Sequence, residues 1–68
     1  MNLKVLRQSI DKGEQRIRQI DKAIEELFET NICGKITDER FIKMTASYEK
    51  EQKNLTASVE NWKLEFEN

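Results

Sequence analysis

Apolar residues recur along this chain at steps of three and four, in two long series separated by a short segment. The first series comprises Leu3, Leu6, Ile10, Ile17, Ile20, Ile24 and Leu27. The second series comprises Phe41, Met44, Tyr48, Leu55, Val59, Trp62 and Phe66. Such steps keep side chains on one stripe of an α-helix, and their repetition over several heptads is typical of a coiled coil. The pattern predicts helices over about 3–31 and 38–66, joined by a turn over 32–37.

The two series match each other when the chain is folded back at Gly34. In six pairs the residue numbers add up to 68 or 69: Leu27–Phe41, Ile24–Met44, Ile20–Tyr48, Ile10–Val59, Leu6–Trp62 and Leu3–Phe66. Gly34 is a natural left-handed stop after a helix. Thr37 is a credible N-cap, because its hydroxyl can accept from a free amide of the next turn. The sequence therefore predicts an all-α fold, an antiparallel two-helix coiled-coil hairpin in which residues 1–68 form one unit.

Two positions interrupt the predicted seam. Gly13 stands opposite Leu55, and Gln52 stands opposite Ile17. Gly13 is either a tolerated glycine, which costs up to about 1 kcal/mol relative to alanine, or a small residue required to admit Leu55 or to allow a bend. A single polar residue at a seam position, as at Gln52, is expected to fix the register at some expense of stability.

Length and charge limit the classes of function. A core built from 68 residues is marginal, so we expect a partner or a second copy to add burial. Twelve basic and thirteen acidic residues give a net charge of −1, and no basic block is present. This composition argues against a surface that follows nucleic-acid phosphates. Glu14 and Arg18, four residues apart, are expected to form a surface ion pair.

Candidate catalytic and metal-binding chemistry is sparse. The chain has no His and a single Cys, so its side chains cannot build a zinc site or an internal disulfide. Phosphate-binding loops and nucleophile motifs are lacking, and we expect no cofactor and no catalysis. The chain also lacks a long apolar run or a signal-peptide core, from which we expect a soluble, cytoplasmic protein without membrane contact.

Five apolar residues outside the two series gather around the predicted turn: Phe28, Ile32, Cys33, Ile36 and Ile42. A tip of this size cannot bury all five, and exposed apolar patches usually mark contact sites. We therefore predict a protein-interaction surface at the tip, with a small plug that caps the hairpin as the alternative. Cys33 lacks the neighbours that a redox thiol requires and is expected to be a small loop residue. At the other end, Val5 and Leu64 are either scattered surface residues or contacts to a neighbouring domain.

The stretch around the turn, IDKAIEELFETNICGKITDERFIKMTASYEKE, resembles the coiled-coil segment of large serine recombinases, the family of phage integrases and transposon resolvases. The matching residues are Leu27, Phe28, Glu29, Asn31, Gly34, Lys35, Ile36, Asp38, Glu39, Arg40, Phe41, Met44, Tyr48, Glu49 and Gln52. Phe28 stands where the family often has Tyr, and Cys33 replaces a small aliphatic residue. The flanks match only as heptads, so the resemblance covers about half of the chain.

The resemblance implies a role in site-specific recombination and DNA integration. In that family the coiled coil projects from a zinc-ribbon domain, and its tip contacts another subunit's coiled coil. These contacts help to decide which DNA sites synapse, and hence the direction of recombination. None of the family's catalytic or zinc-binding residues maps onto this chain, because Ser9, Ser47 and Ser58 do not match the nucleophile motif.

We therefore expect a fragment of a larger recombinase, encoded by a bacterium, a phage or another mobile genetic element. Its expected partners are a second copy of itself and the other domains of the parent protein, without direct contact to nucleic acid. Two alternatives remain open. One is a free-standing hairpin adaptor that binds an unrelated protein helix, and the other is a nucleic-acid-binding arm, which the near-neutral charge argues against.

Overall fold

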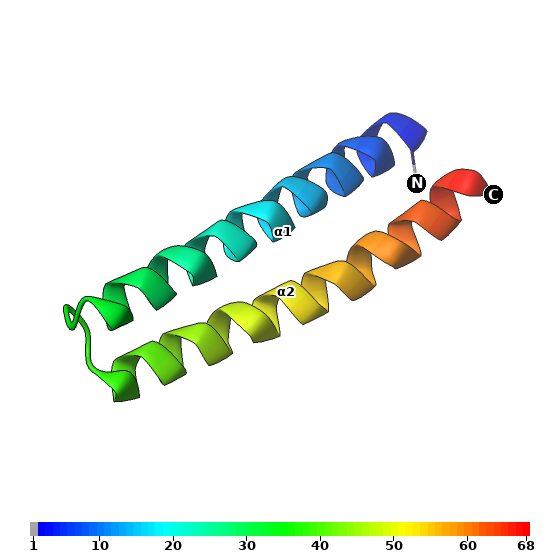
Figure 1. Cartoon of the computed structure of the whole chain (residues 1–68). Coiled ribbons are helices and arrows are strands. Elements are labelled where there is room, and N and C mark those ends of the chain that lie inside the picture. The colour runs from blue at the N-terminus through cyan, green and yellow to red at the C-terminus, as the bar shows by residue number, and fades with distance from the viewer. Residues whose placement is uncertain (1) are drawn as a thin grey trace.

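The computed structural model describes residues 2–68, and Met1, which belongs to the predicted 1–68 unit, lies outside the described residues. Helix α1 spans Leu3–Ile32 and helix α2 spans Asp38–Glu67. The two helices run antiparallel side by side, with both chain ends at one end of the rod (Figure 1). The molecule measures 48 × 14 × 13 Å. The predicted all-α hairpin is confirmed, and each helix ends one residue later than the sequence pattern predicts.

Local signals explain where the helices begin and end. Thr37 caps α2, since its hydroxyl accepts a hydrogen bond from the backbone N–H of Arg40 at 3.2 Å, as predicted. Gly34 has a φ of +74°, the left-handed conformation expected of a helix stop. An additional cap lies at Asn2, whose side chain accepts from the backbone N–H of Lys4 at 2.8 Å. Asn is among the preferred N-cap residues, so the sequence did contain a signal for this start.

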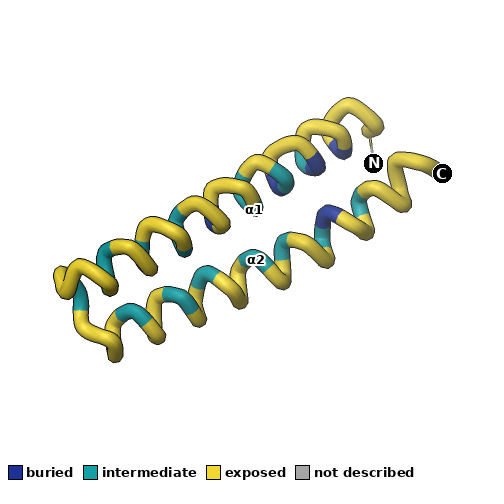
Figure 2. Tube along the Cα trace, in the orientation of Figure 1, coloured by how far each residue is buried: buried dark blue, intermediate teal, exposed yellow. Residues whose placement is uncertain are grey.

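The buried core lies toward the open end of the hairpin, away from the turn. Leu6, Ile10 and Val59 form a buried cluster, against which Ile17 and Trp62 pack. Ile20 is fully buried one turn closer to the tip. Figure 2 shows this distribution, with the buried segments running from the open end to the middle of the rod and none in the last turns before the tip. The predicted pairs Ile10–Val59 and Leu6–Trp62 belong to this core.

The two helices pack closely together at Gly13. A Cβ atom at this position would lie 2.5 Å from Val59 Cγ2 and 3.4 Å from Trp62 Cζ3. Real Cβ atoms do not come as close as the first distance, so the missing side chain is what lets α2 approach here. Of the two alternatives left open by the sequence, the small residue required by packing is the right one. Its principal neighbour is Val59, whereas the predicted Leu55 is 3.7 Å away.

Three predicted seam residues are instead exposed. Leu3, Phe66 and Met44 keep 59%, 37% and 37% of their surface in contact with solvent. Leu3 and Phe66 lie at the ends of the rod, where no further turn covers them. Met44 was chosen because it is apolar, but the regular alternation of four and three that holds from Trp62 to Tyr48 continues to Thr45. Thr45 takes the inner position, with a buried Oγ1 that lacks a hydrogen-bond partner among residues 2–68.

Candidate protein-interaction surface at the hairpin tip

Three large apolar side chains at the tip are exposed to solvent. Phe28, Ile32 and Ile42 have 52%, 62% and 65% of their surface exposed. We call these three residues the tip patch. Of the other two predicted tip residues, Cys33 is exposed and Ile36 is half-buried. The expectation that the tip cannot bury all five is confirmed, while their use in protein contact stays a prediction.

The helical geometry explains why the tip patch is left uncovered. Each helix buries only the stripe that faces the other, and each residue turns the side chain by about 100°. Phe28 follows the seam residue Leu27, and Ile32 lies one turn beyond Phe28 on the same side of α1. Ile42 follows the seam residue Phe41 in the same way on α2. The patch therefore lies beside the seam, where a two-helix fold offers nothing to cover it.

An aromatic pair ties the patch to the seam. The ring centroids of Phe28 and Phe41 are 6.3 Å apart, and the rings are inclined at 53°. Offset and inclined arrangements are the favourable geometries for aromatic rings, because the ring face is negative and the edge is positive. Phe41 is half-buried, so it fixes the orientation of the more exposed Phe28. The patch is thus presented on a defined surface and not on a loose loop.

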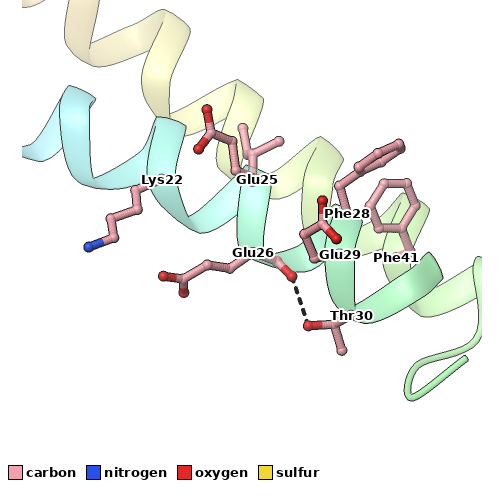
Figure 3. Close-up of a pocket in the computed structure, with 8 residues that line it drawn as sticks. Lys22, Glu25, Glu26, Phe28, Glu29, Thr30 and Phe41 are labelled. Atoms are coloured by element: carbon pink, nitrogen blue, oxygen red, sulfur yellow. Dashed lines mark hydrogen bonds between the residues drawn. The ribbon is translucent and has the colours of Figure 1, made fainter. Parts of the chain in front are cut away.

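A shallow groove of about 820 Å³ runs along the tip half of the hairpin beside this pair. Its apolar floor comprises Ile24, Phe28 and Phe41. Figure 3 shows Glu25 and Glu29 on the side of the two rings, whereas Lys22 and Glu26 extend away from them. The groove therefore combines an apolar floor with a rim of carboxylates, and we call it the acidic groove.

A polar crossing interrupts the seam between the buried cluster near the open end and Ile20. The side-chain amide of Gln52 donates to the carbonyl oxygen of Ile17 at 3.1 Å and to Asp21 Oδ1 at 2.7 Å. The prediction that Gln52 faces Ile17 is confirmed. Because the amide satisfies a specific carbonyl and a specific carboxylate, a shift of α2 along α1 would break both bonds. The crossing therefore fixes the register between the helices.

An ion pair joins the helices close to this crossing. Arg16 donates from Nε to Glu51 Oε2 at 2.7 Å and from Nη2 to Oε1 at 3.0 Å, a two-pronged arrangement. The hydrogen bond from Arg16 lowers the pKa of the Glu51 carboxyl, and the same bond raises the pKa of Arg16. The guanidinium also lies over the ring of Tyr48, 5.9 Å from its centroid.

The remaining ion pair corrects one expectation. Lys63 lies 3.6 Å from Glu14, so Glu14 pairs across the helices with Lys63 and not along α1 with Arg18. Within residues 2–68, no ion pair of 4 Å or less involves the tip. The charges of the tip half are therefore available to solvent or to another molecule.

Other kinds of site find no support in the described part of the chain. No group of three or more His, Cys, Asp or Glu side chains in residues 2–68 is placed to hold a metal ion. Neither α1 nor α2 contains a stretch long and apolar enough to cross a membrane. Val5 and Leu64 are both exposed near the open end, at 49% and 61%.

Comparison of the chain with protein-family profiles, curated proteins and solved structures gives no match. The resemblance to large serine recombinases therefore rests on the sequence pattern around the turn.

Proposed function

We propose that this chain is a protein-interaction arm that contacts a second copy of itself through the tip. In keeping with the resemblance around the turn, we assign it to a large serine recombinase, where the contact regulates synapsis and the direction of site-specific DNA recombination. The observation that carries the proposal is the exposure of Phe28, Ile32 and Ile42, each more than half accessible to solvent, on one small tip.

Burial of the tip patch would be favourable. Removal of apolar surface from water contributes about 25 cal/mol per Å², and full burial of a Phe or Ile side chain about 1.5–3 kcal/mol. Association also costs translational and rotational freedom, so three such side chains support a weak contact between free hairpins. In a complex whose subunits are already held on DNA, the effective concentration is high, and a weak contact becomes decisive.

The charge distribution favours a protein partner over a nucleic acid. The net charge is −1, and the groove beside the tip patch is lined by Glu25, Glu26 and Glu29 with Lys22 as the single base. Carboxylates repel phosphates, and nucleic-acid affinity depends on neutralising them. A nucleic-acid-binding arm would place basic side chains at this position, and the structure places acidic ones.

The proposal is tested in the parent recombinase with Ile32→Lys and Ile42→Glu. Both residues are exposed, so the helices are expected to persist, whereas a charge buried at an interface without a partner costs several kcal/mol. Binding to a single DNA site should be retained, and synapsis should fall at least about tenfold, equivalent to 1.4 kcal/mol or more.

Ala57→Lys and Asn54→Glu provide charge-matched controls, because they place the same two charges at exposed positions of α2 away from the tip. These controls should leave synapsis unchanged. Normal synapsis in well-folded tip variants would remove the tip from the mechanism. Loss of helicity together with synapsis would favour the alternative in which the tip residues form a structural plug.

A further inference from the structure

The acidic groove carries charge that the hairpin does not neutralise. Glu25 and Glu29 lie four residues apart on α1, and both line the groove together with Phe28 (Figure 3). Neither carboxylate has a Lys or Arg nitrogen within 4 Å in residues 2–68. An apolar floor with a row of unpaired carboxylates fits a partner surface in which an apolar side chain is flanked by cations.

The hairpin itself presents such a surface on α2. Arg40, Lys43 and Met44 line a second hollow of about 440 Å³, to which Glu39 contributes the single acidic side chain. Met44 is 37% exposed, and neither cation forms an ion pair among the described residues. We call Arg40, Lys43 and Met44 the basic edge. Met44 suits the floor of the groove, since its flexible thioether packs well against aromatic rings.

The groove and the basic edge cannot meet within one molecule. Met44 comes two residues after Ile42, so the two side chains project about 200° apart around α2. Ile42 lies on the side of Phe28 and the groove, which places the basic edge on the opposite side of the hairpin. The spacing of the charges on the two surfaces is similar. Glu25 and Glu29 are about 6 Å apart along α1, and Arg40 and Lys43 are about 5 Å apart along α2.

A symmetric contact of groove on groove is unfavourable. A two-fold axis brings the same patch of both copies together, so Glu25 and Glu29 would face carboxylates of the second copy. Like charges brought together at an interface cost several kcal/mol. A contact between two different patches avoids this cost and pairs each carboxylate with a cation.

We infer that the acidic groove of one hairpin receives the basic edge of a second copy, in a head-to-tail contact between unlike surfaces. This inference rests on the proposed self-association and adds two surfaces to it, of which the groove shares Phe28 with the tip patch. Because each copy retains one free groove and one free edge, the contact continues to further copies and does not stop at a dimer.

Charge reversal on either surface tests the inference with the full chain. One variant carries Glu25→Lys and Glu29→Lys, and the other carries Arg40→Glu and Lys43→Glu. Each variant alone should self-associate at least about tenfold more weakly than the unmodified chain in sedimentation equilibrium at low salt. An equimolar mixture should recover the association, because the acidic edge then fits the basic groove and the basic edge fits the acidic groove.

A control variant with Asp11→Lys and Glu65→Lys changes the net charge by the same amount as the groove variant, at exposed positions outside both surfaces. It should associate like the unmodified chain, and circular dichroism should give equal helicity for all variants. Association that is unchanged in both reversed variants, or that the mixture does not recover, overturns the head-to-tail contact. The proposed function survives a failure of the head-to-tail contact if the unmodified chain associates and Ile42→Glu abolishes that association. An unmodified chain that stays monomeric at millimolar concentration overturns both the head-to-tail contact and the proposed function.

Discussion

The two halves of this rod share one heptad pattern but differ in how much of their apolar surface is buried. In the open half, Leu6, Ile10 and Val59 meet across the helices and are buried. In the tip half, Ile32 and Ile42 lie outside the seam and remain in solvent. The difference teaches that an apolar residue in a two-helix hairpin stabilises the fold only when it lies on the facing stripe. Apolar residues beside that stripe add little to the stability of the hairpin and are free to contact another molecule.

Two isoleucines of one helix show this most directly. Ile20 is 0% exposed and Ile32 is 62% exposed, although both are apolar, β-branched and placed on α1. The side chain of Ile20 points at α2, and that of Ile32 points past it. Folding and the proposed association therefore depend on separate residues, and each can be tested without disturbing the other.

The largest expected effect follows from truncating these two residues. Ile20→Ala should lower the free energy of unfolding by about 2–5 kcal/mol, the usual range for a buried Ile or Leu. Since a core of this size supplies only about 3–5 kcal/mol, much of the variant should be unfolded at room temperature. Ile32→Ala should change the free energy by no more than about 0.5 kcal/mol.

Urea unfolding followed by circular dichroism measures both, at micromolar concentration so that association does not contribute. Equal losses for Ile20→Ala and Ile32→Ala would erase the distinction between the two halves. A mild effect at Ile20 alone would show that the core lies elsewhere.

A smaller effect is expected at the close approach in the open half. Gly13→Ala gains up to about 1 kcal/mol of helix propensity, but its Cβ would overlap Val59 Cγ2, and overpacking costs about 1–3 kcal/mol. Val59 is β-branched and restricted in its rotamers, so it cannot move aside easily. We expect a net loss of about 1 kcal/mol, equivalent to a lower Tm by about 4–8 °C.

The partner variant Val59→Ala checks the cause. In the Val59→Ala background the same Gly13→Ala change should become neutral or stabilising, because the overlapping methyl group is gone. A double-mutant cycle measures this coupling. A penalty that is the same in both backgrounds would mean that Gly13 acts through the backbone and not through contact with Val59.

The smallest effect on stability is expected for the ion pair Arg16–Glu51, which joins the two helices near the middle of the rod. Arg16 lowers the pKa of Glu51 in the folded chain, so the pair adds stability above the ordinary carboxyl pKa of 4.5. That contribution is lost as the pH falls through the lowered value. The raised pKa of Arg16 matters only at strongly alkaline pH, beyond the accessible range. The effect is small because both side chains are more than 40% exposed and screened by solvent.

The measurement compares thermal unfolding of the unmodified chain with Glu51→Gln between pH 7 and pH 2.5. The advantage of the unmodified chain should shrink below pH 4.5. An advantage that stays constant over this range would show that the hydrogen bonds, and not the charge, connect Arg16 to residue 51.

Much of the fold followed from the sequence, because the heptad steps, Gly34 and Thr37 indicate the same hairpin independently. Met44 was misplaced because hydrophobicity outweighed the regular spacing that leads to the polar Thr45. The pair Arg16–Glu51 was missed since long charged side chains can bend toward several neighbours, and sequence alone does not choose among them.

For the candidate surface, the sequence predicts which residues are exposed but not how their side chains are arranged. Apolar residues outside the seam near a turn indicated the tip patch. The inclined pairing of Phe28 with Phe41 and the position of the carboxylates beside it depend on side-chain directions in three dimensions. The separation of the acidic groove from the basic edge likewise required the helices to be placed together.

The central claim, that the tip patch serves contact and not folding, is tested most directly by one comparison. Sedimentation equilibrium up to millimolar concentration, with circular dichroism on the same samples, is applied to the unmodified chain and to the variant with Ile32→Lys and Ile42→Glu. We predict equal helicity, association of the unmodified chain, and association of the variant that is weaker by at least about tenfold, or 1.4 kcal/mol. A well-folded variant that associates as strongly as the unmodified chain would contradict the claim.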